Sequence, residues 1–204
     1  MYLKKFIIGK LMALIKQNGN YDEIKLDEIQ YGLVSIYLSI TKAIFIFFLA
    51  FLLGIIKEVI IYTIIYNGIR STSFGLHATK SWICLLSSTI LFISIPYLCS
   101  IIQLDIIQKF VIGVIACIFI YKNSPADTHK RPIISMTRRR VYQLLSTLIA
   151  CIYIIVSLII SSQFIANSLI FSLVVQCFVI SPMVYRFFHL PYDNYKQYQV
   201  TLSS

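Results

Sequence analysis

Long apolar runs follow one another along this chain, with only short polar segments between them. Hydrophobic residues make up 58% of the sequence and the mean hydropathy is +0.82, whereas soluble domains are typically about 45–50% apolar. One globular core cannot hide so many apolar side chains, and in a bilayer only helices and closed barrels satisfy the backbone. These runs predict an all-α integral membrane protein that forms a single membrane domain over residues 1–204.

About six transmembrane helices fit the hydropathy pattern, as a bundle over residues 31–185. The expected spans are residues 33–55, 59–69, 82–104, 106–121, 141–160 and 164–185. The second and fourth are shorter than the roughly 20 residues that a crossing helix needs. Removing either one, however, would put a basic cluster on the wrong side of the bilayer.

The two ends of the chain are expected outside the bundle. Residues 1–30 form a cytoplasmic or interfacial segment, in which residues 1–16 predict an amphipathic helix lying on the inner leaflet. Asn18-Gly19-Asn20 breaks this helix, and residues 21–30 form either a separate helix or the first turns of a long one. Residues 186–204 are expected to be a polar cytoplasmic tail.

Basic residues lie mainly between the apolar runs. The chain has 18 Lys and Arg against 8 Asp and Glu, a net charge of +10. With six spans and the N-terminus inside, only Lys57 and Lys109 face outward, which is the distribution that the positive-inside rule favours. Both termini are therefore expected in the cytoplasm, with basic loops that contact lipid headgroups or dock an acidic peptide. No nucleic-acid-binding motif is present, so no nucleic-acid partner is predicted.

The five cysteines form neither a metal nor a disulfide pattern. They are Cys84, Cys99, Cys117, Cys151 and Cys177, an odd number with irregular separations and no CxxC or CxxH spacing. A Gly-rich phosphate loop is also missing, so the sequence predicts no metal, no other cofactor and no ATP-driven pump. Four of the cysteines lie within apolar runs, where they behave as small hydrophobes. Cys84 differs because polar and charged residues come directly before it.

Cys84 and His77 form the candidate catalytic pair. They lie in the segment Gly75-Leu76-His77-Ala78-Thr79-Lys80-Ser81-Trp82-Ile83-Cys84, where a short basic stretch leads into the third span. A thiolate is a strong nucleophile and an imidazole is the usual group that takes its proton, so the pair suggests a thiol peptidase at the bilayer surface. A helix cap at Thr79 or Ser81 would put Cys84 near the positive helix end, which together with Lys80 favours the thiolate.

The seven-residue spacing sets a condition on this pair. Along one straight helix the two side chains would be roughly 10 Å apart, whereas proton transfer needs direct contact or one bridging water. His77 must therefore lie on a loop that folds back over the helix start, and Gly75 supplies the backbone freedom for such a loop. The alternative is a structural Cys84 in an apolar helix, with His77 as an interfacial residue.

The longest polar stretch, residues 121–140, is also the most basic. Pro125 and Pro132 prevent a continuous helix through it. Asp127 is its one acidic residue, suited to a local turn or to orienting the imidazole as a third member of the site, with Asn67 or a water as alternatives. The basic side chains that could bind carboxylates are Lys130, Arg131 and Arg138–Arg140. For the arginine triplet, anchoring to the inner leaflet is the favoured interpretation.

Together the two segments resemble the accessory gene regulator protein B family, the membrane-embedded cysteine peptidases of bacterial quorum sensing. The residues that carry the resemblance are Tyr31-Gly32-Leu33, Arg70, Gly75, His77-Ala78, Cys84, Pro125-Ala126-Asp127, Lys130-Arg131 and Pro132. Their order, the chain length and the hydropathy agree along nearly the whole sequence. One position departs: many members have two adjacent glycines before the histidine, and here the first is Phe74.

This resemblance implies an enzyme of the bacterial cell membrane whose site lies at the cytoplasmic face. Its partner would be a precursor signal peptide, AgrD-like, with an amphipathic leader, a signal core and an acidic tail. Cys84 would attack the bond after the core, with His77 as base, and the resulting acyl-thioester would be displaced by an internal thiol or hydroxyl to close a thiolactone or lactone ring.

The same resemblance leaves several points open. Arg70, Lys130 and Arg131 are hypothesised to receive the acidic tail. A peptide exporter and a non-catalytic membrane scaffold are the alternatives to the enzyme. Self-association as a homodimer, the sequence and ring chemistry of the signal, and export of the product are not decided by these residues.

Overall fold

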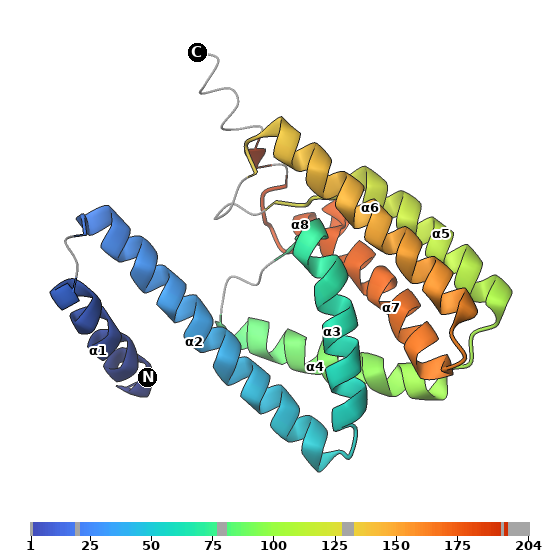
Figure 1. Ribbon diagram of the computed structural model, residues 1–204, viewed down its shortest axis with the longest axis horizontal. Coiled ribbons are helices and arrows are strands. Elements are labelled where there is room, and N and C mark those ends of the chain that lie inside the picture. The colour runs from blue at the N-terminus through green and yellow to red at the C-terminus, as the bar shows by residue number, and fades with distance from the viewer. Residues whose placement is uncertain (1, 19–20, 77–80, 128–132, 193, 196–204) are drawn as a thin grey trace. The chain divides into compact units, whose positions relative to one another are not determined.

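The fold is helical throughout the part of the chain that the computed structural model describes, which is residues 2–18, 21–76, 81–127, 133–192 and 194–195 (Figure 1). The helices are α1 (Tyr2–Asn18), α2 (Glu23–Leu52), α3 (Ile56–Ser73), α4 (Ser81–Ile101), α5 (Ile106–Asn123), α6 (Met136–Ile159), α7 (Gln163–Ile180) and α8 (Pro182–Phe187). The extended backbone that pairs within these ranges is one isolated bridge between Phe74 and Ala126. The prediction of an all-α membrane protein is confirmed.

Five of these helices, α2, α4, α5, α6 and α7, are long and apolar enough to cross a membrane. The remaining predicted span, residues 59–69, is the middle of α3. This helix is less apolar because it carries Lys57 and Glu58 at its start and Arg70 in its last turn. Its 18 residues rise roughly 27 Å, close to the thickness of the hydrocarbon core. The chain is therefore a multi-pass membrane protein with about six spans and an N-terminal helix.

Residues 1–52 form one compact unit, made of α1 and α2 in contact with each other. Because α2 is continuous from Glu23, the acidic stretch is the first turns of a long helix and not a separate one. The helix ends at Leu52, three residues before the predicted end of the span. Gly54 has φ +72°, a left-handed conformation in which glycine avoids the steric cost of a side chain and the helix cannot continue.

Residues 53–204 form the second unit, which is organised around α7. This helix packs against α3, α4, α5 and α6 and is buried along most of its surface, with Val174 and Phe178 exposed. Figure 1 shows α5, α6 and α7 running side by side, while α4 runs in a different direction and packs against α3 and α7. The core contains Tyr62, Ile69, Ile120 and Leu173, so the residues leading into His77 and the Pro-Ala-Asp segment belong to one packed unit.

The last predicted span is shorter than expected, which corrects the sequence-based boundary at Tyr185. The helix α7 ends at Ile180 because Pro182 has no backbone N–H to donate and disfavours helical backbone in Ser181, which is extended at φ −66° and ψ 129°. The chain then turns into the short helix α8, whose Tyr185 is buried. After this turn, the C-terminal segment packs back against the other helices of the second unit.

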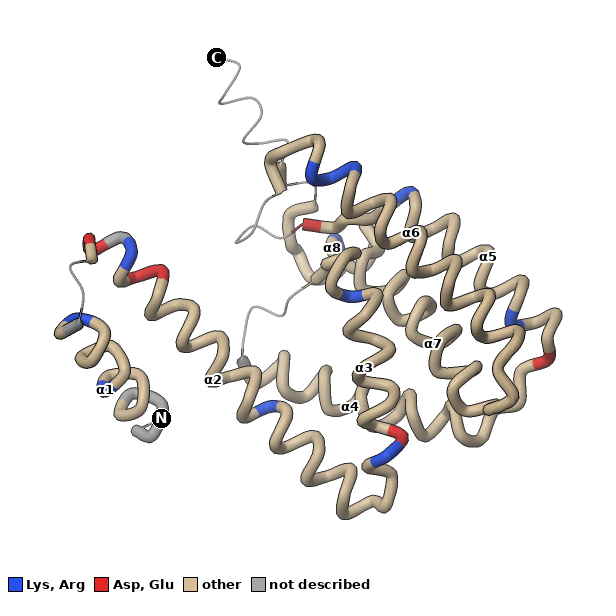
Figure 2. The backbone as a smooth tube through the Cα atoms, in the orientation of Figure 1, with Lys and Arg blue, Asp and Glu red and all other residues tan. Residues whose placement is uncertain are grey.

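Most basic residues of the second unit lie on the backbone toward one of its ends (Figure 2). The last turn of α3, the first turns of α6 and α8 meet there and contribute Arg70, Arg138–Arg140 and Arg186. The opposite end has Lys57 with Glu58 and Lys109 with Asp105. Lys109 is buried and donates to the Gln163 side-chain oxygen at 3.0 Å. The end formed by α3, α6 and α8 is therefore the more basic one, which is the asymmetry that the sequence predicts.

Candidate active site

Cys84 lies in the first turn of α4, where it is the fourth helical residue and half-buried. The described helix starts at Ser81, and the helix cap at Thr79 or Ser81 stays a prediction. His77, Thr79 and Lys80 lie outside the described residues, and the pairing of Cys84 with His77 stays a prediction. None of the five cysteines is in a disulfide. The position of Cys84 near the start of α4 is the one that the sequence predicts.

The approach to His77, residues 74–76, is paired with the Pro-Ala-Asp segment. Gly75 N–H donates to the Ala126 carbonyl at 2.9 Å, and Ala126 N–H donates to the Ser73 carbonyl at 3.1 Å. These two bonds make the parallel bridge between Phe74 and Ala126. The two segments that carry the sequence resemblance therefore touch, although one follows α3 and the other follows α5.

The helix α7 supplies a second support for this approach. The Gln176 amide nitrogen donates to the Phe74 carbonyl at 2.8 Å, and Leu76 N–H donates to the Val179 carbonyl at 3.2 Å. Sequence analysis missed Gln176. The sequence could have indicated this residue, because a polar amide within an apolar span is expected to face a partner inside the bundle.

Arg70 holds the same approach from the end of α3. Its Nη1 donates to the Phe74 carbonyl at 3.0 Å and its Nη2 donates to the Leu76 carbonyl at 2.8 Å. The guanidinium is half-buried and near Tyr185, where its charge lowers the pKa of the tyrosine while burial, the larger effect, raises it. Tyr185 therefore keeps its proton and donates to the Asp127 carbonyl at 3.3 Å. In the structure Arg70 binds the backbone of this approach.

Two residues of the approach have backbone conformations that glycine prefers. Gly75 has φ +118°, and a Cβ added there would lie 2.9 Å from Arg70 Nη1 and from Val179 Cγ1. Phe74 has φ 56° and ψ −137°, at the position where the resemblance leads one to expect a glycine. Such a conformation costs a larger residue on the order of 1–3 kcal/mol. The Phe74 ring packs edge-on against Tyr142 at 5.0 Å, and an aromatic pair of this kind offsets part of that cost.

Asp127 is buried, and its carboxylate oxygens accept hydrogen bonds from four N–H groups. These come from Ile133 N, Arg139 Nη1, Asn194 N and Tyr195 N. The assignment of Asp127 as a third catalytic residue stays a prediction. Lys130 and Arg131 lie outside the described residues.

Arg139 was grouped in the sequence with its neighbours as a lipid anchor, and the structure separates it from them. It is half-buried, whereas Arg138 and Arg140 are exposed. Besides Asp127, it donates to the Pro125 carbonyl at 3.2 Å. Helical spacing could have indicated this, because Arg139 shares a face of α6 with the buried Ser146 and Ala150.

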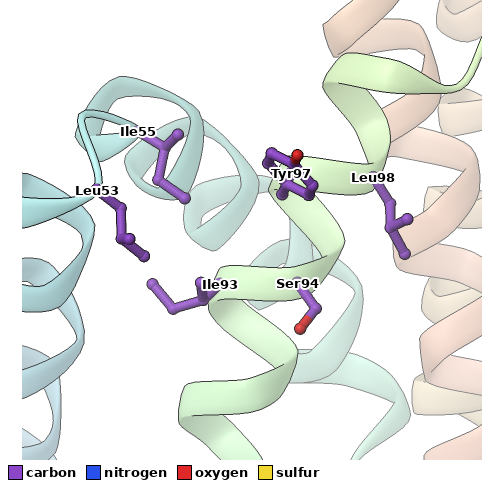
Figure 3. A pocket seen from close by; sticks show the side chains of 6 residues that line it. All are labelled: Leu53, Ile55, Ile93, Ser94, Tyr97 and Leu98. Carbon is purple, nitrogen blue, oxygen red and sulfur yellow. The ribbon is translucent and has the colours of Figure 1, made fainter.

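We also considered metal-binding clusters and recesses among the described residues as alternative functional sites. Among the described residues, no group of three or more His, Cys, Asp or Glu could hold a metal ion. A largely apolar hollow of about 390 Å³ is lined by Leu53, Ile55, Ile93, Ser94, Tyr97 and Leu98 (Figure 3). It lies beside the start of α3, whereas Arg70 is in the last turn of that helix. None of the predicted site residues lines it.

Replacing Arg70 by lysine tests what this side chain does. Lysine keeps the positive charge but cannot donate in a fork to the Phe74 and Leu76 carbonyls. If Arg70 mainly holds the approach, we expect Arg70→Lys to lower cleavage of an acidic-tailed precursor roughly tenfold, since two charge-assisted hydrogen bonds are lost. If it mainly attracts the acidic tail, lysine retains most of the activity and the loss appears only with Arg70→Gln. Initial cleavage rates at two salt concentrations separate these results.

These observations define a class: a multi-pass helical membrane protein with a cysteine in the first turn of one helix and two loop segments that share a backbone bridge. The chain belongs to the accessory gene regulator B family, whose model matches residues 8–180. This family acts in accessory gene regulation, a form of quorum sensing.

Individual relatives align with this chain over most of their own length. A protein named AgrB-like from Clostridium acetobutylicum is 25% identical over 200 residues, covering 98% of this chain and 94% of that protein. An AgrB-like protein from Listeria monocytogenes serotype 4a is 26% identical over 190 residues, or 92% of each chain. The accessory gene regulator protein B of Staphylococcus carnosus is 32% identical over 164 residues, covering 79% of this chain and 84% of that one. No solved structure matches the chain.

Proposed function

We propose that this protein is a membrane cysteine endopeptidase that removes the acidic C-terminal tail from a quorum-sensing precursor peptide and promotes cyclisation of the signal core. The observation that carries the proposal is the contact between the two motif segments. The residues leading into His77 bond to Ala126, and Cys84 follows in the first turn of the next helix. Membership of the accessory gene regulator B family supports the same reading.

The chemistry needs only one thiolate and one imidazole. His77 takes the thiol proton, and the Cys84 sulfur attacks the carbonyl carbon of the peptide bond after the core. As the carbon–nitrogen bond breaks, the imidazolium returns its proton to the departing amine of the acidic tail. The core stays on Cys84 as an acyl-thioester.

Ring closure uses the same two groups. His77 takes the proton of a thiol or hydroxyl within the core, and that atom attacks the thioester carbonyl, which releases Cys84 as thiolate. Exchange between two similar thiols is near thermoneutral, so the site mainly has to keep water from hydrolysing the thioester. A thiol at the end of a membrane helix suits that requirement, because hydrocarbon covers one side of it.

The charge distribution supports a site at the cytoplasmic face. The basic end of the second unit carries Arg70 and the start of α6, and the positive-inside rule places such an end in the cytoplasm with both termini. Lys130 and Arg131 are proposed to receive the acidic tail, together with whatever donors Arg70 has left after binding two carbonyls. Anionic lipid headgroups would be the other partner of this end.

Trapping the thioester is the experiment that tests the proposal. The probe is the short amphipathic peptide with an acidic end that we expect a neighbouring gene to encode, co-expressed with this chain. Acid quenching and mass spectrometry should find the core attached to Cys84, with the adduct removed by neutral hydroxylamine. An exporter or a scaffold would move or bind the peptide without forming this adduct, and a tail released with no adduct and no dependence on Cys84 would overturn the proposal.

A further inference from the structure

The Asp127 carboxylate is enclosed by backbone N–H groups from the nearby Ile133 and the distant C-terminal segment, and by the Arg139 side chain. The Asp127 side chain is 1% exposed. One oxygen accepts from Asn194 N at 3.1 Å, and the other accepts from Tyr195 N at 3.1 Å, with Ile133 N and Arg139 Nη1 each at 3.4 Å. An ionised carboxylate offers about four acceptor positions, so these donors are enough to occupy it. Burying the charge is tolerable only because it is paired in this way.

The C-terminal segment that supplies two of these donors is itself packed down. We call the described residues of this segment, 190–192 and 194–195, the strap. It begins where Leu190 N–H donates to the Tyr185 carbonyl at 2.9 Å, and the Tyr192 ring then packs edge-on against Tyr185 at 5.1 Å. At its far end the Arg139 guanidinium lies 3.6 Å over the centre of the Tyr195 ring. The strap therefore runs from α8 to the start of α6 and passes Asp127 between them.

The strap is one residue away from the candidate site. Asp127 directly follows Ala126, whose carbonyl accepts from Gly75 N–H and whose N–H donates to Ser73. Arg139 binds the Pro125 carbonyl on the other side of Ala126. A change that frees Asp127 from the strap therefore removes a restraint on the neighbouring Ala126. Because Ala126 bonds to the backbone that leads into His77, that backbone also loses a restraint.

From this arrangement we propose that Asp127 is a positioning residue: it fastens the strap across the Pro-Ala-Asp segment and so keeps the approach to His77 in place. The inference rests on the proposed function, since the approach matters because His77 is taken as the base. Asp127 acts here through backbone N–H groups and not by contact with the imidazole. The C-terminal segment then becomes part of the catalytic scaffold, although it lies after the last span.

Four chains test the strap: Asp127→Asn, a chain ending at Leu190, the two changes combined, and a control ending at Gln197 that keeps the strap. Asparagine has the same shape but turns an amide donor toward one of the backbone N–H groups. We expect each single change to lower kcat for the co-expressed precursor roughly tenfold with little change in KM, because a small displacement of a catalytic group is costly. The chain that combines the two changes should have the same kcat as either single change, since both changes remove one contact. The control chain should have the kcat of the wild type.

Two further readouts keep the test independent of activity. Hydrogen exchange at Gly75 and Ala126 should speed up roughly tenfold in the chain ending at Leu190 and stay slow in the control. If wild type shows no Cys84-dependent cleavage, the proposed function fails, and the exchange data still decide whether the strap restrains the approach. Should Asp127→Asn fail to accumulate in the membrane, Arg139→Lys replaces it, with the exposed Arg138→Lys as its matched control.

Three results would overturn the inference. The chain ending at Leu190 could keep full activity and slow exchange, or the losses from Asp127→Asn and the truncation could multiply. Alternatively, Asp127→Asn could move the acidic limb of the pH–rate profile to lower pH while truncation leaves it in place. A carboxylate beside an imidazolium raises the pKa of that group, so this last result would assign Asp127 to His77 directly.

Discussion

A chain carrying Cys84→Ala is expected to release no acidic tail from the precursor, with a rate at least about a thousandfold below wild type, because the only group proposed to form the acyl intermediate is gone. Alanine removes the sulfur without adding volume at the start of α4, where Cys84 is half-buried. The helix should therefore form and insert normally. Tail release followed by mass spectrometry, normalised to the amount of protein in the membrane, measures the effect.

The matched control for this change is Cys151→Ala. Like Cys84, Cys151 is in a membrane helix and in no disulfide, and it is exposed on α6 with its sulfur 3.7 Å from that of Cys117. We expect this variant to cleave at the wild-type rate, since neither thiol lies at a helix start. Equal losses from both replacements would mean that cysteine removal damages the bundle, and normal cleavage by Cys84→Ala would exclude the thiol mechanism.

Gly75→Ala is the second change with a large expected effect. A methyl group there would meet Arg70 Nη1 and Val179 Cγ1 at 2.9 Å and the Val179 carbonyl at 3.1 Å, at a backbone angle of φ +118°. The combined crowding and strain are on the order of 2–5 kcal/mol. Because Gly75 lies beyond the end of α3, we expect the strain to loosen the approach to His77 while the bundle persists, with cleavage reduced roughly a hundredfold.

Gly32→Ala is the control for Gly75→Ala. Nothing lies within 4 Å of a Cβ at Gly32, and the residue is inside α2, where alanine favours the helix over glycine. This variant should be produced at least as well as wild type and should cleave normally. If Gly75→Ala cleaved as fast as Gly32→Ala, the approach would tolerate a displacement that the proposed geometry does not allow.

Much of the fold could be predicted from the sequence because hydropathy acts locally. The spans that correspond to α4, α5 and α6 differ from the observed helices by only a few residues. The errors come from single residues: Pro182 ends α7 at Ile180, and Gly54 follows the early end of α2. Both residues were visible in the sequence, but an apolar run continues past each of them and hides the break.

Less of the candidate site could be predicted, because its contacts join segments far apart in the chain. The sequence indicated Arg70, Gly75, Asp127 and the thiol, but it assigned Arg70 to the substrate alone. The structure shows Arg70 bound to two backbone carbonyls. The role of Gln176 depends on α7 lying against the end of α3, which no local pattern reports.

The candidate pair behind the proposed chemistry, a thiol near the start of a membrane helix with a histidine seven residues before it, came from the sequence alone, because residue type and apolar length are local properties. The tertiary structure decided how the approach to that histidine is held: by Arg70, by Ala126 and by the strap on Asp127. Such support forms only when helices pack, because each buried donor or acceptor must find a partner and the nearest one often belongs to a distant part of the chain.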